Sequence, residues 1–389
     1  MPMRVESRAG LRVCLGVEGF YPMGGTERQI VELALELHRR EIPVTVLSRW
    51  PIDHDNGYAG ELRQAGVRLL TSGWRGRGRD RFCRFPYYWA RVRAGFGDAA
   101  ALEQQLWRWY SAKVRDLDGP GFVLHEVPFL GALSVAGRRA LGSLGVPLVL
   151  TVLGRMEEIV PVVDIPGAIV TADGEPELLP AGVPVTWVPS MGHRCLAALA
   201  PDLERAPSRT IVYGGRLVPA KGVDTLLRAL ALLPPAFKLV VAGDGPERPE
   251  LECLARSLGV SAHFVGPLGP SQLFEFLRRS DVAAFPAVQG EGLPSFVVEA
   301  LGAGTPVVGT DVGTVARALE DGGGLVVPPR DPSALAAGIR QLTESDLVRH
   351  RRLARRAFEA RFSPSRVVDS YVRHYHAAIQ QAAGYRAAP

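Results

Sequence analysis

The sequence predicts an α/β protein built from two doubly wound domains, each a parallel sheet covered by helices on both faces. Two series of short apolar segments alternate with amphipathic segments, one before and one after residue 200. Such alternation favours parallel strands joined by helical crossovers. The length of 389 residues exceeds the roughly 250–300 residues that one core sustains. A hydrophobic content of 47% is enough for two cores.

The first series begins with an apolar strand over residues 11–17, followed by an amphipathic helix over residues 26–40. This helix places Ile30, Leu33 and Leu37 on one stripe, which is the spacing of a helix that packs on a sheet. The remaining strands of this series are expected at 44–47, 122–124, 148–152, 168–170 and 185–188. The strands of the second series are expected at 210–214, 238–242, 263–265, 282–285, 306–308 and 324–327.

A segment rich in proline and charge, residues 200–208, interrupts this pattern and is the expected interdomain linker. The domains are therefore placed at residues 1–200 and 201–371. The tail is helical in pattern with a break near Pro364, and its last part, about residues 372–389, is expected to complete the N-terminal domain. The cleft between two such domains is the default place for a ligand.

Composition argues against several classes of function. A net charge of +5 is weak for this length, and no RNP, zinc-finger or basic-zipper pattern accompanies it, so a nucleic-acid partner is not expected. The four cysteines are scattered without metal-ligand spacing, which predicts free thiols in a reducing, cytoplasmic setting. The bias toward arginine, alanine, glycine and proline indicates a GC-rich bacterial genome.

Contact with a membrane is expected to be peripheral at most. Residues 1–10 are polar, so no signal peptide is expected. No apolar run approaches the ~18–20 residues needed to span a bilayer. The stretch from Trp74 to Arg93 mixes arginine with aromatic residues, which fits either a membrane-surface contact or an aromatic loop packed on its own domain. The sequence does not predict an oligomeric state.

The most informative residues are Glu291 and Glu299, eight residues apart at an expected strand–loop–helix junction. On one helix they would be about 12 Å apart along the axis. The carboxylate pair of a glycosidase is closer, at about 5–9.5 Å. Pro294 suits the first turn of a helix, so the helix is placed from this residue. Three backbone N–H groups would then face an anion, those of Ser295, Phe296 and Val297.

Two cationic residues follow the first strand of the second series. Arg216 and Lys221 lie between that strand and the next helix, where they would neutralise a diphosphate without a metal. Lys221 is one of only three lysines in the chain, which favours a role over chance placement on the surface. Residues 243–246 and 265–267 end the next two strands, and they are either simple turns or places where backbone approaches a ligand.

Together these motifs resemble glycosyltransferase family 4, whose members are retaining enzymes of the GT-B fold. The set is Gly-Arg…Lys-Gly, Gly-Asp-Gly-Pro, Phe-Val-Gly and Glu-Gly-Leu-Pro…Glu-Ala, in this order, over about residues 209–345. The resemblance implies two Rossmann-like domains that face each other across a cleft. It also implies a nucleoside diphosphate sugar, UDP-linked, as co-substrate, with no metal or other cofactor.

The resemblance also assigns roles to residues. Arg216 and Lys221 would bind the donor diphosphate, and Glu299 would bind the ribose. Glu291 would contact the transferred sugar near the reacting centre. Other donor contacts would come largely from backbone, at Gly215, Gly243, Val265, Gly266, Leu293, Pro294, Ser295, Phe296 and Val297.

The first half carries two further matches. Gly24 and Gly25 lie in a segment that resembles the family's glycine loop, which approaches the donor phosphates and the acceptor. His125 and Glu126 begin a segment that resembles the family's His-Glu-x-Pro motif, in which the histidine lies by the donor sugar. A lone histidine is more often structural, so both a catalytic and a structural interpretation of His125 stay open.

The acceptor side departs from the family. Leu153 stands where a histidine is frequent, and residues 189–193 replace the usual Pro-Asn-Gly-Val-Asp. Acidic residues are expected on this side, namely Glu18, Glu126, Glu157, Glu158 and Asp164. They would attract a cationic small-molecule acceptor, such as an amino sugar or aminocyclitol natural product. A merely solvated acidic face is the alternative.

The implied reaction is transfer of a hexosyl group to an acceptor hydroxyl with retention, in which the leaving phosphate takes the acceptor proton. The segment Asp53-His54-Asp55 resembles a metal-binding DxD motif but is interpreted as chance. Alternatives are a transferase that builds a cell-surface polysaccharide or glycolipid, a sugar-nucleotide epimerase or hydrolase, and a non-catalytic sugar-nucleotide binder. A nicotinamide oxidoreductase is disfavoured because no GxGxxG motif is present.

Overall fold

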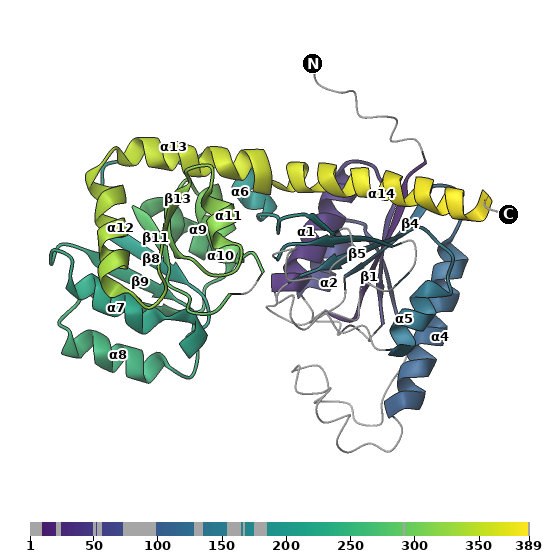
Figure 1. The fold of residues 1–389 in the computed structure, drawn as a ribbon, viewed down its shortest axis with the longest axis horizontal. Coiled ribbons are helices and arrows are strands. Elements are labelled where there is room, and N and C mark those ends of the chain that lie inside the picture. The colour runs from purple at the N-terminus through teal and green to yellow at the C-terminus, as the bar shows by residue number, and fades with distance from the viewer. Residues whose placement is uncertain are drawn as a thin grey trace. The chain divides into compact units, whose positions relative to one another are not determined.

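The chain folds as two compact units, each a parallel sheet with helices packed against it (Figure 1). Unit 1 comprises Met1–Val188 and Val368–Pro389, and unit 2 comprises Pro189–Val367. The predicted α/β class with two doubly wound domains is therefore confirmed. The computed structural model describes residues 10–20, 25–49, 52, 57–72, 99–127, 135–153, 165, 168–174, 185–290 and 292–387.

In unit 1 the described strands form a seven-stranded sheet in the order β3-β2-β1-β4-β5-β6-β7. Its strands are β1 (Arg12–Val17), β2 (Val44–Ser48), β3 (Arg68–Thr71), β4 (Phe122–Val127), β5 (Leu148–Val152), β6 (Ala168–Ala172) and β7 (Val185–Trp187). Its helices are α1 (Gly25–Arg39), α2 (Gly57–Gln64), α4 (Ala99–Leu117), α5 (Val135–Gly142) and most of α14 (Pro364–Ala387).

Side chains alternate across each strand of unit 1 and therefore pack into two layers, one on each face of the sheet. Cys14 of β1 and Leu124 of β4 pack in one layer with Tyr110 of α4. His125, the next residue of β4, faces the other layer, where its ring lies against Tyr375 of α14. The last helix is thus part of the core of unit 1 although it follows unit 2 in the chain.

In unit 2 the strands form a six-stranded sheet in the order β10-β9-β8-β11-β12-β13. They are β8 (Thr210–Gly214), β9 (Lys238–Ala242), β10 (Ala262–Gly266), β11 (Val282–Phe285), β12 (Val307–Thr310) and β13 (Gly324–Val327). The helices are α6 (Arg194–Ala198), η4 (Pro219–Lys221), α7 (Val223–Ala231), α8 (Arg248–Ser257), α9 (Pro270–Arg279), α10 (Ser295–Gly302), α11 (Val315–Leu319), α12 (Pro332–Glu344), α13 (Leu347–Ala357) and η5 (Phe358–Phe362).

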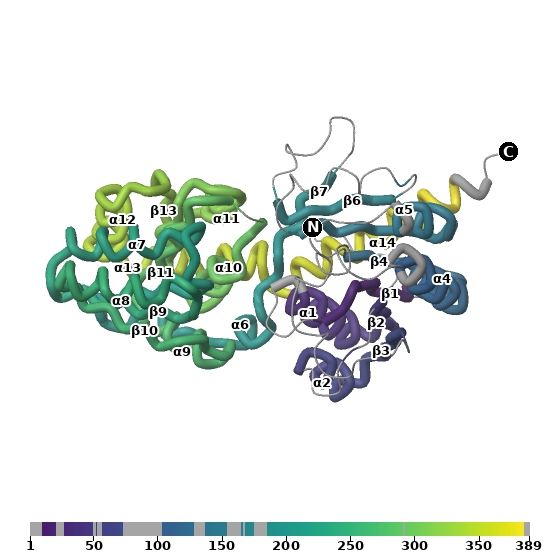
Figure 2. Tube along the Cα trace, turned by 90° about the horizontal axis from the view of Figure 1, so that it is seen from below, coloured from purple at the N-terminus to yellow at the C-terminus, as the bar shows by residue number. Residues whose placement is uncertain are grey.

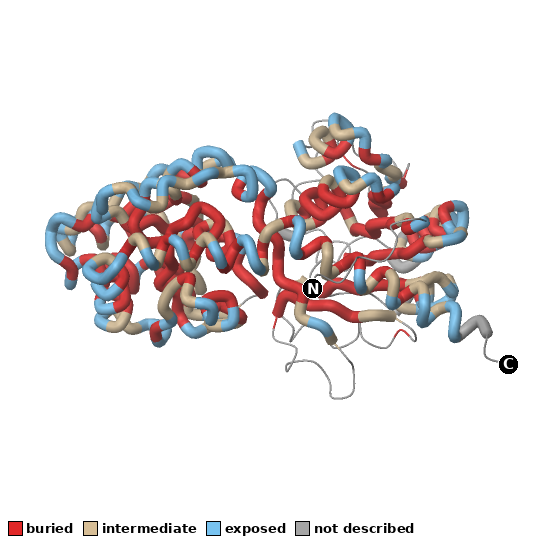
Figure 3. Tube along the Cα trace, turned by 90° about the horizontal axis from the view of Figure 1, so that it is seen from above, coloured by how far each residue is buried: buried red, intermediate tan, exposed pale blue. Residues whose placement is uncertain are grey.

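Apolar residues of α7, α8 and α12 pack on one face of the unit 2 sheet around Tyr213, Val241 and Ala284. On the opposite face, a Cβ at Gly214 would lie 2.6 Å from the ring of Phe296 in α10, so β8 and α10 are in close contact. Burial follows this layering, because the inner strands of both sheets are buried and the outer surfaces of the helices are exposed (Figure 3).

The two sheets share one strand order. In each, the first strand lies inside the sheet, two strands are added on one side, and the chain then crosses to the other side (Figure 2). All the strand pairs are parallel. The point where the order reverses lies between β1 and β4 in unit 1 and between β8 and β11 in unit 2. In doubly wound sheets, ligands bind outside the carboxyl ends of the strands at this point.

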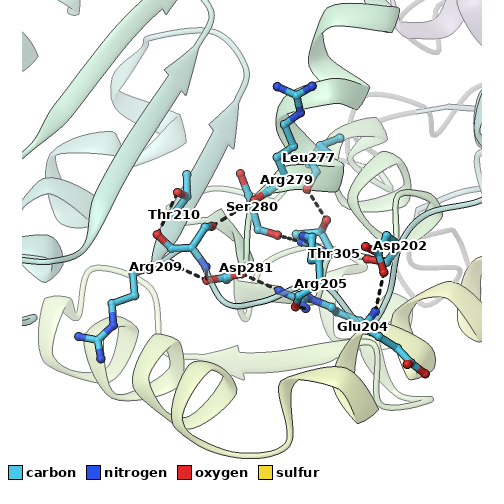
Figure 4. Close-up of polar contacts among 12 residues, drawn as sticks. Asp202, Glu204, Arg205, Arg209, Thr210, Leu277, Arg279, Ser280, Asp281 and Thr305 are labelled. Atoms are coloured by element: carbon cyan, nitrogen blue, oxygen red, sulfur yellow. Dashed lines mark hydrogen bonds and ion pairs between the residues drawn. The ribbon is translucent and has the colours of Figure 1, made fainter.

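The expected linker, residues 200–208, is instead packed onto unit 2 (Figure 4). The carboxylate of Asp281 accepts hydrogen bonds from the backbone N–H groups of Ser208 and Arg209, at 2.7 and 2.6 Å. The guanidinium of Arg351 donates to the same carboxylate at 2.6 Å and to the carbonyl of Arg205 at 2.6 Å. Asp281 and Arg351 are both buried, so this ion pair holds the segment to the core of unit 2.

The boundary between the units lies at Val188 and Pro189 rather than at residue 200. The residues between these positions pack on unit 2, because the backbone N–H of Gly192 donates to the carbonyl of Phe362 at 2.7 Å. Of the four cysteines, Cys14, Cys195 and Cys253 are free thiols, and Cys83 lies outside the described residues.

Candidate functional site

Two loops meet at the carboxyl edge of the unit 2 sheet, where its strand order reverses. One follows β8 and the other follows β11, and these strands are direct neighbours. The backbone N–H of Val288 donates to the carbonyl of Ala220 at 2.9 Å, which joins the loops. Gly222 has a φ of +62°, and a Cβ there would lie 2.2 Å from the carbonyl oxygen of Pro286. Only glycine allows the two loops to approach this closely.

Both predicted cations lie at this edge. The Arg216 side chain is exposed, and its carbonyl accepts a hydrogen bond from the buried Tyr213 hydroxyl at 2.9 Å. Lys221 ends η4 and is half-buried, and its Nζ lies 5.6 Å from the ring centroid of Phe285, the last residue of β11. The loop after β8 thus carries two positively charged residues, of which Lys221 lies beside the end of the neighbouring strand β11.

Helix α10 begins one residue later than predicted. Pro294 has a φ of −65° and a ψ of 124°, so it precedes the helix as its cap and Ser295 is the first helical residue. The carbonyl of Pro294 accepts from the N–H of Val297 at 3.0 Å. The prediction that this N–H is available to an anion is therefore wrong. The N–H groups of Ser295 and Phe296 remain in the first turn, and Glu299 is half-buried in the second.

Glycine turns extend the hydrogen-bond ladder beyond the ends of β8, β9 and β10. The N–H of Gly215 donates to the carbonyl of Ala242 at 2.9 Å, and the N–H of Gly243 donates to the carbonyl of Gly266 at 2.8 Å. The φ angles of these three glycines are +156°, +141° and +78°. A Cβ at Gly243 would lie 1.8 Å from the carbonyl oxygen of Gly215. The motifs recognised in the sequence are therefore neighbours in space.

At the corresponding edge of unit 1, His125 is fully buried and hydrogen-bonded at both ring nitrogens. Nδ1 lies 2.7 Å from the Tyr375 hydroxyl, and Nε2 lies 2.6 Å from the Thr151 hydroxyl. Burial, with a smaller contribution from the charge of His374, lowers the pKa of His125 to about 3. The ring is therefore neutral near pH 7. These contacts are those of a structural histidine, and the catalytic role stays a prediction.

Glu126 points to the opposite layer and is also fully buried. Its carboxylate pairs with the guanidinium of Arg49 and accepts a hydrogen bond from the Tyr110 hydroxyl at 2.5 Å. Burial lowers the pKa of Arg49, but the charges of Glu126, Tyr110 and Glu18 and the hydrogen bond to Glu126 together outweigh burial, so the pKa is raised. A Cβ at Gly16 would lie 2.0 Å from both the Glu126 carboxylate and the Tyr110 hydroxyl. Glu126 therefore faces an internal cation rather than a solvated surface.

The remaining predicted site residues lie largely outside the described residues. These are Glu291, Gly24, Glu157, Glu158 and Asp164. The segment at residues 53–55, which resembles a DxD motif, also lies outside them. Gly25 is the first residue of α1, and Glu18 is half-buried just after β1. The roles predicted for all of these residues stay predictions.

A family model described as "Glycosyl transferases group 1" matches residues 200–359. This range contains both cations, the glycine turns and α10. Residues 200–359 form a group 1 glycosyltransferase domain.

Two curated relatives each match less than half of the chain. A D-inositol 3-phosphate glycosyltransferase of Geodermatophilus obscurus is 37% identical over 198 residues, which are 46% of this chain and 43% of that protein. A phosphatidyl-myo-inositol mannosyltransferase of Mycobacterium leprae is 35% identical over 162 residues, 40% of this chain and 43% of that protein. The match thus spans less than half the length of these relatives.

The fold extends the likeness to both units. The solved structure of HepE from Anabaena in complex with UDP has a TM-score of 0.70 and 18% sequence identity. The alignment covers 94% of this chain and 100% of that one. At this identity the likeness concerns the fold alone, and the fold is GT-B.

The matched range contains Arg216, Lys221 and Glu299, for which the sequence motifs predict donor binding. Sequence reasoning missed Arg49 and Tyr110 of unit 1. Arg49 directly follows β2, so its place at the carboxyl end of a strand was the available signal. Within the described ranges, His, Cys, Asp and Glu form no group of three or more suited to a metal ion, and no helix is long and apolar enough to cross a membrane.

Proposed function

We propose that the chain transfers a sugar from a nucleoside diphosphate sugar, UDP-linked, to an acceptor hydroxyl with retention of configuration. The observation that carries this proposal is that the loop with Arg216 and Lys221 and the loop that leads into α10 follow two neighbouring strands, β8 and β11, where the strand order of unit 2 reverses. Cations and a helix N-terminus at one sheet edge favour an anionic ligand.

In this proposal the leaving diphosphate lies between the two cations and the start of α10. Charge that develops on the leaving phosphate is stabilised by Arg216, Lys221 and the N–H groups of the first helical turn. These groups supply positive charge without a metal ion. Glu299, one turn further along α10, binds the ribose hydroxyls. Glu291 contacts the transferred sugar.

The acceptor proton passes to the leaving phosphate on the same face of the sugar, so no protein nucleophile forms a bond to it. The bond from the anomeric carbon to the donor phosphate breaks as the bond to the acceptor oxygen forms. We give His125 no proton-transfer role, because both of its ring nitrogens are engaged inside unit 1. Rate enhancement comes from positioning and charge stabilisation.

The choice of UDP is supported by the bound nucleotide in the HepE structure, which shares this fold. The acceptor is a small molecule or a glycan. A cationic acceptor would now depend on Glu18, Glu157 and Glu158, since Glu126 is paired with Arg49. Replacing Glu157 and Glu158 by Gln is expected to raise the Michaelis constant of such an acceptor, and an unchanged value would contradict this part of the proposal.

The diphosphate site is tested with Lys221→Ala and a matched control, Lys238→Ala. Lys238 is exposed at the amino end of β9, on the opposite edge of the same sheet. A charge-assisted hydrogen bond is worth about 1.5–3 kcal/mol. Lys221→Ala should therefore weaken UDP binding about 10- to 100-fold, and Lys238→Ala should leave it unchanged. The dissociation constants are measured by calorimetry, after thermal shifts with UDP, GDP, ADP and TDP identify the base.

Turnover separates the transferase from the other classes. Transfer to an acceptor at the wild-type rate by Lys221→Ala would refute the diphosphate role. Release of free sugar without an acceptor would favour a hydrolase. Tight donor binding without turnover across acceptors would favour a non-catalytic sugar-nucleotide binder.

A further inference from the structure

The edge strand of the unit 2 sheet carries a bulge next to the glycine turns. Phe264 of β10 pairs with Val241 of β9, whereas Gly266 pairs with Ala242. Val265 is therefore an extra residue, and 39% of its surface is exposed although it is apolar. Bulges at sheet edges re-aim side chains and are frequent beside functional sites.

One arginine contacts this bulge from a neighbouring helix. Arg248, the first residue of α8, donates through Nη2 to the carbonyl of Phe264 at 3.2 Å. Its Nε donates to the carboxylate of Glu252 at 2.8 Å, and its Nη1 lies 4.0 Å from the carboxylate of Asp244. A Cβ at Gly266 would lie 3.7 Å from Nη1. Arg248 thus joins α8, the Gly-Asp-Gly-Pro turn and the bulge.

The strand order puts this cluster at a fixed distance from the cations. β10 is separated from β8 by β9, and neighbouring strands are about 4.8 Å apart, so the bulge is about 10 Å from the end of β8. A ligand with its diphosphate at Arg216 and Lys221 extends along this edge through its ribose. A base attached to this ribose would lie within reach of Val265 and Gly266 if the ligand runs from β8 toward β10.

We propose that Arg248 is a positioning residue for recognition of the donor base. It holds the bulge so that the Val265 side chain and the backbone at Gly266 form the surface on which the base lies. The planar guanidinium suits this task, because it serves a carbonyl and two carboxylates at the same time in a fixed geometry. This inference rests on the proposed function, since it assumes a nucleotide at this edge.

A simple surface ion pair within α8 would behave differently. Removing such an ion pair would change the stability slightly. It would not change the affinity for a ligand with a base differently from the affinity for a ligand without one. Arg278 provides the matched control, because it forms an exposed ion pair with Glu275 inside α9, away from the bulge. Arg248→Lys keeps the charge but loses the fork, so it tests the geometry.

The experiment measures dissociation constants for UDP and for inorganic pyrophosphate, with wild type, Arg248→Ala, Arg248→Lys and Arg278→Ala. Arg248→Ala should bind UDP about three- to tenfold more weakly than wild type, because it loses a hydrogen bond that orders the base surface. Pyrophosphate binding should stay within about twofold of wild type, because the diphosphate site is intact. Arg248→Lys should be intermediate, and Arg278→Ala should match wild type. Urea midpoints verify that each variant is folded.

Two results would overturn the role of Arg248 but leave the proposed function standing. One is wild-type UDP affinity in Arg248→Ala. The other is an equal loss of UDP and pyrophosphate affinity, which would indicate a general disturbance of the site. If wild type binds none of UDP, GDP, ADP and TDP, the proposed function fails and this inference fails with it.

Discussion

The two units have the same strand order, but they differ in how far charged and polar residues are buried near the carboxyl edges of their sheets. In unit 1, Glu126 is fully buried against Arg49 and Tyr110, and His125 is fully buried between two hydroxyls. In unit 2, Arg216 is exposed and Lys221 half-buried in the loop after β8, at the carboxyl edge of the sheet. The same scaffold can therefore use its polar residues for internal cohesion or for a ligand. Burial and partners, rather than residue type or motif, distinguish the two uses.

The largest expected effect concerns the buried pair in unit 1. Glu126→Ala leaves the Arg49 charge buried without its partner, which should cost about 3–5 kcal/mol of the free energy of unfolding. Urea denaturation measures this loss. Arg49→Met combined with Glu126→Leu removes both charges and should recover much of the stability. A single variant as stable as wild type would show that the pair contributes no internal cohesion.

The second effect is a pH dependence that originates in His125. Its folded pKa is about 3, below the ordinary value near 6.5. Above pH 6.5 the ring is neutral in both states. As the pH falls from 6.5 toward 3, the unfolded state binds a proton that the folded state excludes, so stability decreases by about 1.4 kcal/mol per pH unit. His125→Gln should lack this contribution.

Urea denaturation at pH 6.5 and 5.0 measures how much the free energy of unfolding falls between these two pH values. The fall should be about 2 kcal/mol larger in wild type than in His125→Gln. His263→Gln is the control, because His263 is exposed on the edge strand β10. Identical pH dependence in wild type and His125→Gln would contradict a buried neutral ring, and would favour a histidine open to a ligand.

The smallest effect on free energy is expected in unit 2. Arg216→Ala should weaken UDP binding about tenfold, or about 1.4 kcal/mol, because one charged contact to the diphosphate is lost. Its urea midpoint should match that of wild type, since the exposed side chain packs on no core. Arg228→Ala, at an exposed position on α7, is the control. A loss of stability without a loss of UDP affinity would show that Arg216 has a structural role, like Glu126 and Arg49 in unit 1.

Local patterns predicted most of the fold. Strands β8 and β9 are short apolar runs, of which β8 ends in Gly214 and β9 is followed by Gly243, so the sequence indicates both directly. β3 was missed because its four residues are exposed or half-buried and show no alternation. The predicted start of α10 was one residue too early, because Pro294 has an extended ψ and therefore precedes the helix. Residue type alone does not indicate the ψ angle.

Long-range partners could not be predicted in the same way. The segment at residues 200–208 has the composition of a linker, but Asp281 holds Ser208 from 73 residues away. His125 matched a family motif, yet its hydroxyl partner Tyr375 is 250 residues distant. The motifs of unit 2 follow directly after short apolar strands, which is a local pattern, and the ligand roles of their residues stay predictions. The polar residues of unit 1 act through tertiary contacts that leave no local pattern.

The path of the chain through its units sets an order of events during synthesis. Unit 2 is one continuous segment, whereas unit 1 is closed by residues 368 onward. A ribosome that adds 5–20 residues per second needs roughly 10–40 s to make residues 189–367. For that interval β4 exists without Tyr375, and His125 has no phenolic partner. Unit 2, which contains the group 1 domain, is therefore synthesised in full and free to fold while unit 1 still lacks its last helix.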